Sequence, residues 1–456
     1  MQQELGAPGI GNAAMIPVPE SVEQGGRSIG ELVQWAHSVS ERSVLAASGA
    51  IFGIMRPPSQ LSRHFIDLDE AYGAHNYSPL DLVVERAEGV WLYDVDGARY
   101  LDCISAYSAV NQGHCHPRIH AALLAQAAKV PLTSRALRND RMGRFLKKLT
   151  DVTGFERALP MNTGAEAVET AIKLTRRWGY RHKGMAQDAA EIIVFANNFH
   201  GRTTAIVSAS TNEGYRTDFG PFMPGFVFVN YGDADALERA ITPNTCAVLI
   251  EPIQGEGGVV VPPEGFLKRA WALCREHNVL FAADEIQTGF GRTGDLFACD
   301  FDNVRPDVLI VGKALGGGYY PVSAVLASEA LMSLFGPGDH GSTFGGNPLA
   351  SAVAEAALDV IIDEKLAECA RYAGAKLMQG LRTIHSPLVK EIRGRGLLIG
   401  IELTAPAKAL SLALLERGIA AKDTHEFVLR IAPPLVIGDD EIDYLLERYR
   451  ESLEAL

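Results

Sequence analysis

Short apolar runs alternate with amphipathic stretches through the middle of the chain. The runs at 191–196, 246–250, 279–283 and 308–311 are almost entirely apolar and have the length of β-strands. Such continuous runs are typical of strands that are buried on both faces of a mostly parallel sheet. Between two of these runs, apolar residues recur at helical spacing from Phe266 to Cys274. The alternation predicts an α/β fold with a mostly parallel central sheet.

The two ends of the chain show different patterns. Residues 89–94 form a strand-like stretch that is followed by the turn dipeptide Asp96-Gly97, which predicts a hairpin. After Asn347-Pro348 we expect a long helix, a strand from Leu397 to Leu403, and a helix-turn-strand finish. We therefore predict a partly helical N-terminal extension, a segment that contributes to a small domain, a large α/β domain and a C-terminal small domain, at residues 1–64, 65–117, 118–346 and 347–456.

The composition describes a folded, acidic protein. The chain has 456 residues, of which 47% are hydrophobic, and 42 basic against 55 acidic residues give a net charge of -13. This balance argues against a surface that follows nucleic-acid phosphates, so we expect no nucleic-acid partner.

Cysteine spacing and hydropathy narrow the class further. The six cysteines include no Cys-x-x-Cys pair, so we expect no metal site and no secreted disulfide framework. The uncharged stretch Ser43–Met55 is much shorter than the about 20 residues that a membrane span needs. The N-terminus also lacks the pattern of a secretion or transit signal. We expect a cytoplasmic protein with no membrane span.

Two charged residues stand where apolar runs end. Asp284 follows the run at 279–283, and Lys313 follows Val308–Gly312. In open α/β sheets, ligands bind at the carboxyl ends of the strands. A lysine buried there has a lowered pKa and can act as an amine nucleophile. Taken alone, Lys313 is better explained as a member of a structural ion pair, and Asp284 as a helix cap or an ion-pair partner.

Two further stretches add binding groups. Thr163, Gly164 and Ala165 open a strong helix, where small residues expose N–H groups that suit a phosphate. Phe199 and Arg202 follow the apolar run at 191–196, where a ring can stack on the aromatic and a carboxylate can pair with the guanidinium. Each stretch alone could be an ordinary helix cap or a packed loop. Together with the strand-end carboxylate and lysine, they are what pyridoxal 5'-phosphate requires.

The stretches 284–294 and 307–318 resemble the signature of the class III (ω-amino) aminotransferases, which belong to the fold-type I pyridoxal phosphate enzymes. The resemblance runs from about Phe65 to the C-terminus. Within the class it is greatest to the ornithine δ-aminotransferases, through 73–79, 105–117, 159–164, 219–226 and 340–347.

The resemblance implies a role for each cofactor residue. Lys313 would bind the cofactor covalently, Asp284 would pair with the ring nitrogen, Gln287 would contact the ring hydroxyl, and Phe199 would stack on the ring. It also implies a homodimer in which the other subunit completes the phosphate site. The remaining cofactor contacts would be Thr163, Gly164, Ala165, His200 and Ile286, with Ser342 and Thr343 from the other subunit.

The same resemblance implies a substrate pocket. Tyr77 and Tyr107 match tyrosines that recognise ornithine, and Arg202 matches the arginine for the carboxylate far from the reacting nitrogen. Glu256 and Arg430 match a switchable pair, in which Glu256 neutralises Arg430 until 2-oxoglutarate binds; the alternative is a constitutive salt bridge. The implied reaction moves the δ-amino group of L-ornithine to 2-oxoglutarate, giving glutamate 5-semialdehyde and glutamate.

Two features depart from the ornithine enzymes, and other functions stay open. Position 200 is His where those enzymes carry a bulkier aromatic residue, and the extension has no counterpart in the core family. The alternatives are a class III transaminase for lysine, acetylornithine, 4-aminobutyrate or a diamine, and a racemase, which needs no amino acceptor. A DNA-binding regulator is disfavoured because the extension is acidic.

Overall fold

The computed structural model describes residues 57–456. The apolar stretch Ser43–Met55 and most of the predicted extension lie outside the described residues. The first described helix, α2 (Gln60–Tyr72), begins at the N-cap Ser59, whose side chain accepts a hydrogen bond from the Ser62 amide. The boundary predicted between residues 64 and 65 therefore falls inside one helix.

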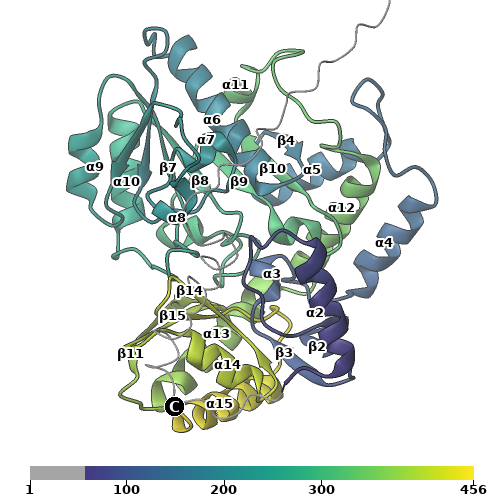
Figure 1. Cartoon of the computed structure of the whole chain (residues 1–456). Helices are drawn as coiled ribbons and strands as arrows, with labels where there is room; N and C mark the ends of the chain where they lie inside the picture. Colours follow the sequence, from purple (N-terminus) through teal and green to yellow (C-terminus); the bar gives the residue numbers. More distant parts are fainter. Residues whose placement is uncertain (1–56) are drawn as a thin grey trace, which may run out of the picture. The chain divides into compact units, whose positions relative to one another are not determined.

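A seven-stranded sheet forms the centre of the fold (Figure 1). Six strands are parallel, and β10 alone runs antiparallel to both of its neighbours. The prediction of a mostly parallel α/β sheet is confirmed, including the four apolar runs. In sheet order the strands are β4 (Arg157–Met161), β10 (Ser323–Ala327), β9 (Val308–Val311), β8 (Leu280–Asp284), β7 (Thr245–Ile250), β5 (Glu191–Phe195) and β6 (Phe226–Val229).

Alternate residues of the central strands pack against helices on opposite faces of this sheet. Val194, Leu249 and Ile310 join a core cluster with the apolar side of α6 (Gly164–Arg181). Their neighbours in the chain join the cluster that contains α10 (Phe266–Glu276). Burial on both faces explains why these strands are continuously apolar.

Two smaller sheets are built from the ends of the described chain. One has the order β1 (Val84–Glu88), β2 (Trp91–Asp94), β3 (Arg99–Asp102) and β13 (Ile419–Ala420), and its β2–β3 pair is the predicted hairpin. The other has the order β11 (Val389–Arg395), β12 (Leu398–Leu403), β15 (Val428–Ile431) and β14 (Lys422–Thr424). The first sheet therefore joins residues near position 100 to residues near position 420.

The predicted helix-turn-strand segment is present as α14 (Lys408–Leu415) followed by β13, β14 and β15, but it is not the finish, because a further helix follows it. α15 (Asp439–Glu454) buries Ile442, Leu445 and Tyr449, which recur at helical spacing. None of the described helices is long and apolar enough to cross a membrane. The remaining helices are α3 (Ser105–Ser108), α4 (Pro117–Ala127), α5 (Met142–Thr153), α7 (Thr204–Val207), α8 (Glu213–Arg216), α9 (Ala234–Ala240), α11 (Glu329–Met332), α12 (Pro348–Asp363), α13 (Leu366–Thr383) and α14 (Lys408–Leu415), with the 3₁₀ turns η1 (Ala298–Asp302) and η2 (Lys313–Gly316).

Candidate functional site

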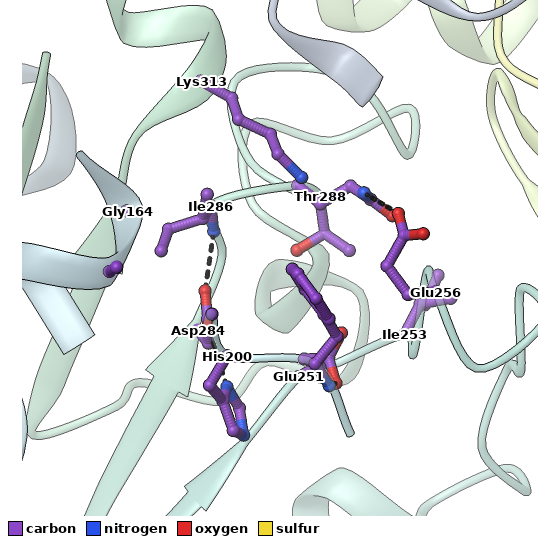
Figure 2. Close-up of a pocket in the computed structure, with 13 residues that line it drawn as sticks. Gly164, His200, Glu251, Ile253, Glu256, Asp284, Ile286, Thr288 and Lys313 are labelled. Atoms are coloured by element: carbon purple, nitrogen blue, oxygen red, sulfur yellow. Dashed lines mark hydrogen bonds and ion pairs between the residues drawn. The ribbon is translucent and has the colours of Figure 1, made fainter. Parts of the chain in front are cut away.

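A cavity of about 210 Å³ lies at the carboxyl ends of the parallel strands (Figure 2). Asp284 is the last residue of β8, Glu251 directly follows β7, and Lys313 opens the turn after β9. The cavity therefore lies at the edge of the sheet where the sequence places the chemistry. Its lining is Gly164, Ala165, Phe199, His200, Gly201, Glu251, Ile253, Glu256, Asp284, Ile286, Gln287, Thr288 and Lys313.

Lys313 brings an amine with a lowered pKa into this cavity. The residue has a left-handed backbone (φ 43°), and its side chain extends toward the carboxylates (Figure 2). Burial lowers the pKa of Lys313 to about 8 and the charge of Arg430 adds to this, although Glu256 and Asp284 act in the opposite direction. A substantial fraction of the amine is therefore neutral near physiological pH, as an amine nucleophile requires.

We expect Lys313 to be the most reactive lysine of the apoprotein near neutral pH. A group with a pKa of about 8 is about 10% neutral at pH 7, whereas an ordinary lysine is below about 0.1%. Trace labelling with acetic anhydride across pH 6–10, read by peptide mapping, should give a midpoint near 8 for Lys313. Lys376 is the control, because hydrogen bonding to Asp439 raises its pKa. A midpoint for Lys313 near that of Lys376 would contradict this prediction.

Asp284 is held by two contacts. Its Oδ2 atom lies 2.7 Å from His200 Nδ1, and its Oδ1 atom accepts the Ile286 amide at 3.1 Å. Burial alone would lower the pKa of His200, but the hydrogen bond and charge of Asp284 outweigh it and raise that pKa. The carboxylate is thus held in one orientation beside a histidine whose cationic form it stabilises. Such a carboxylate can pair with a protonated ring nitrogen.

The first turn of α6 supplies backbone donors. Thr163 caps the helix through its side chain, which accepts the Glu166 amide, and Glu166 in turn accepts the Thr163 amide. The first-turn amides of Gly164 and Ala165 have no acceptor within the helix, and both residues line the cavity. A Cβ atom on Gly164 would come within 3.1 Å of Ile286. This turn can therefore bind an anionic group such as a phosphate.

The loop after β5 carries the aromatic ring of the cavity. The Phe199 amide donates to Glu251 Oε2 at 2.9 Å. The Arg202 guanidinium lies 4.3 Å from the ring centroid of Tyr215, which meets Phe199 edge-on at 5.8 Å. Arg202 is exposed and lies outside the cavity lining. Its predicted role in binding a carboxylate stays a prediction.

Glu256 and Arg430 form an ion pair beside the cavity. Glu256 Oε1 accepts from Arg430 Nη1 at 2.5 Å and from Gln287 Nε2 at 3.1 Å. Although burial opposes it, the charges of Arg430 and Lys313 lower the pKa of Glu256. The Tyr107 ring lies 4.8 Å from the Arg430 guanidinium carbon. The pair is formed in this structure, and whether it opens during the reaction stays a prediction.

Some predicted residues are not brought to the cavity by this chain. Tyr77 is 71% exposed, and Thr343 is absent from the lining. Ser342 accepts a hydrogen bond from the Asn162 side chain at 2.8 Å, next to the helix cap Thr163.

Glu251 was not among the residues predicted from the sequence. This buried carboxyl lines the cavity, and burial raises its pKa to about 7, although the charge of His200 opposes that shift. The signal was present, because Glu251 directly follows the apolar run at 246–250, as Asp284 follows its own. Gly201, Ile253 and Thr288 also line the cavity but carry no chemical pattern that singles them out.

Comparison with known proteins identifies relatives over most of the chain. The family model for class-III aminotransferases matches residues 72–453, which include every residue of the cavity lining. An ornithine aminotransferase from Brevibacillus brevis is 56% identical over 390 residues, which are 86% of this chain and 98% of the relative.

Two solved structures add a structural likeness. The ornithine aminotransferase of Toxoplasma gondii, crystallized with oxidized glutathione and described with partial occupancy of pyridoxal phosphate at its active site, has a TM-score of 0.86 at 42% identity, over 94% of this chain and 98% of that chain. The acetylornithine aminotransferase of Elizabethkingia anophelis has a TM-score of 0.80 at 48% identity, over 87% and 99% of the two chains.

Proposed function

The chain belongs to the class-III aminotransferase family, and from this premise we propose that it transfers the δ-amino group of L-ornithine to 2-oxoglutarate. The products are glutamate 5-semialdehyde, which cyclises to pyrroline-5-carboxylate, and glutamate. One observation carries the proposal. The lysine, carboxylate and helix end that this chemistry needs line a single cavity, with the Glu256–Arg430 pair beside it.

Pyridoxal 5'-phosphate fits this cavity by the chemistry of its donors. Gln287 Oε1 is buried and has no hydrogen-bond partner among the described residues, so it offers an acceptor for a hydroxyl group. The first-turn amides of α6 suit a phosphate, and Asp284 suits a protonated pyridine nitrogen. When bound, the cofactor supplies an electron-withdrawing ring that stabilises charge developing on the substrate carbon. The cavity lining and the family membership support this choice of cofactor.

The side chains of the cavity divide the remaining work. Lys313 Nζ would attach the cofactor and, once displaced by the amino donor, would accept a proton from the substrate carbon and deliver it to the cofactor carbon. Phe199 would cover one face of the ring, while His200 keeps Asp284 oriented. Buried apolar neighbours such as Ile253 exclude water from this chemistry.

Two sets of side chains support ornithine as the amino donor. Arg202, stacked on Tyr215, offers its guanidinium to the carboxylate at the far end of the substrate. Glu256 neutralises Arg430 while the δ-amine reacts, and releasing Arg430 allows it to bind the carboxylate of 2-oxoglutarate. Tyr107 lies against Arg430 and would meet the substrate there.

A panel of amino donors tests the substrate. Purified holoenzyme is assayed with 2-oxoglutarate and ornithine, N-acetylornithine, lysine, 4-aminobutyrate or putrescine, and o-aminobenzaldehyde traps the cyclised semialdehyde. We expect ornithine to have the highest kcat/KM. A higher value for N-acetylornithine or another donor would refute the substrate while leaving the family assignment intact, and turnover of one amino acid enantiomer into the other without 2-oxoglutarate would indicate a racemase.

We expect Glu256→Gln to change the choice of donor. The amide keeps the shape and the contact to Gln287 but removes the charge that neutralises Arg430, so donors with a carboxylate near the reacting carbon gain. The ratio of kcat/KM for ornithine to that for glutamate should fall by at least about tenfold, which equals about 1.4 kcal/mol. The exposed Glu264→Gln is the matched control and should leave the ratio unchanged. An unchanged ratio in Glu256→Gln would show that the charge of Glu256 does not control the choice of donor.

We also propose that the enzyme is a cytoplasmic homodimer. Leu61, Phe65, Leu68 and Tyr72 expose large apolar side chains from one helix, α2, and Thr343 does not line the cavity of its own chain. A second copy that covers α2 and contributes Ser342 and Thr343 accounts for both observations. All six cysteines are free, which suits a reducing compartment. Light scattering of the holoenzyme should give a mass of at least two chains, and a monomeric active enzyme would refute the dimer.

A further inference from the structure

Four successive residues of the turn at Ser105–Ser108 have a left-handed backbone. The φ angles are 47°, 45°, 59° and 71° for Ser105, Ala106, Tyr107 and Ser108, and none of the four is glycine. A Cβ atom comes too close to the neighbouring carbonyl in this conformation, so non-glycine residues adopt it singly and rarely in succession. The turn is therefore strained, and strain of this kind persists only where the surrounding structure imposes it.

Contacts on both sides impose the conformation. Before the turn, the buried Asp102 accepts the amides of Ile104 at 2.8 Å and Ser105 at 2.9 Å through Oδ1, while its Oδ2 lies 2.7 Å from His114 Nε2. After the turn, Gln112 donates to the carbonyl of Ala314 at 2.8 Å, next to Lys313. The turn is thus held between β3 and the segment that carries the reactive lysine.

The turn presents a single side chain to the site. Ala106 is exposed at its centre, and the next residue, Tyr107, lies with its ring 4.8 Å from the guanidinium carbon of Arg430. Arg430 is 3% exposed and pairs with Glu256 on its other side. The ring therefore lies directly against the guanidinium that would bind a substrate carboxylate. A turn with an ordinary right-handed backbone would direct the Tyr107 side chain elsewhere.

We propose that the strained left-handed turn Ser105–Ser108 holds Tyr107 against Arg430 and so makes the enzyme selective for ornithine over α-amino acids. This inference rests on the proposed function and adds the backbone element that positions its specificity residue. The turn acts through Tyr107 and is a positioning element. Relieving the strain should stabilise the protein but lower its selectivity, because the Tyr107 ring is then free to move.

Ala106→Gly tests this role of the turn, because the exchange removes only an exposed methyl group and relieves the left-handed strain. We expect the Tm of the holoenzyme to stay unchanged or rise, while KM for ornithine rises about fivefold, as expected for the loss of one cation–π contact. The kcat should change by less than about twofold, and the ratio of kcat/KM for ornithine to that for glutamate should fall about fivefold. Ala106→Val adds a β-branched group at the same position and should lower Tm.

Lys365→Gly is the matched control. Lys365 is exposed, has a φ of 52° and starts α13 away from the cavity, so the exchange should leave Tm unchanged or higher and leave KM unaltered. A lowered Tm in Ala106→Gly would show that the turn is not strained, and an unchanged KM and ratio would show that it does not position Tyr107; either result overturns the proposal. A wild-type enzyme that does not use ornithine would refute the proposed function alone. The role of the turn is then tested with the ratio of kcat/KM for the enzyme's preferred donor to that for glutamate.

Discussion

Replacing Lys313 with alanine is expected to lower kcat for transamination by at least about 10⁴-fold, because the variant loses both the amine that attaches the cofactor and the base that moves the substrate proton. Among residues 57–456, no other lysine lines the cavity. Cofactor binding should weaken but persist, since the helix end at Gly164, Asp284 and Gln287 are untouched. The visible absorbance of bound cofactor should shift to that of the free aldehyde, and added methylamine should restore a small part of the activity.

Lys183→Ala is the control for this experiment. Lys183 is also partly buried, and burial lowers its pKa. Its amine donates to the carbonyl of Thr245 at the start of β7. This is the amino end of the strand, whereas the cavity lies at the carboxyl ends of the strands. Full activity of the Lys183 variant, together with loss of activity in the Lys313 variant, would show that transamination depends on Lys313. More than about 1% of wild-type kcat in Lys313→Ala would refute the assigned role.

Replacing Arg292 with leucine is expected to lower the free energy of unfolding by about 3–5 kcal/mol, because each buried polar group that loses its hydrogen-bond partner costs about 1–3 kcal/mol. Arg292 is fully buried. Its Nη2 donates to Asn111 Oδ1 at 2.6 Å, and its Nη1 donates to the carbonyls of Leu397 at 3.0 Å and Pro433 at 2.5 Å. Leucine leaves three buried acceptors without a donor.

Urea unfolding of the holoenzyme measures this effect. Burial lowers the pKa of Arg292 to about 9, so the charge is already disfavoured in the folded state and its hydrogen bonds carry the stabilisation. Arg292→Lys should lose less, because it keeps one donor. The control is Arg269→Leu, an exposed residue paired with Glu238, where at most about 1 kcal/mol is expected. Equal losses at positions 292 and 269 would contradict the structural role of the buried network.

The parts of the fold and site that could be predicted depend on local patterns. The strands β8 and β9 are buried on both faces, so their sequences are continuously apolar and their ends mark Asp284 and Lys313. The same rule applied to β7 would have found Glu251. The final helix α15 was missed although its apolar residues have helical spacing, so that failure belongs to the interpretation and not to the sequence.

Other features have no local pattern. The left-handed turn around Tyr107 contains no glycine, and the contacts that impose it come from Asp102 and from the segment after β9. The buried hydrogen-bond network of Arg292 depends on carbonyl groups, which every residue has. The pairing of β3 with β13 joins distant parts of the chain through backbone hydrogen bonds. Such tertiary contacts override local preference and could not be predicted from spacing.

The pairing of β3 with β13 has a consequence for protein synthesis. The strands of the seven-stranded sheet are complete once residue 327 has left the ribosome, whereas the sheet that holds Asp102 waits for Ile419–Ala420. Arg430 is made later still. Because domains form as their segments emerge, the cofactor half of the site can assemble on a nascent chain that has no substrate half. The selectivity of the enzyme is therefore acquired only in the last stage of its own synthesis.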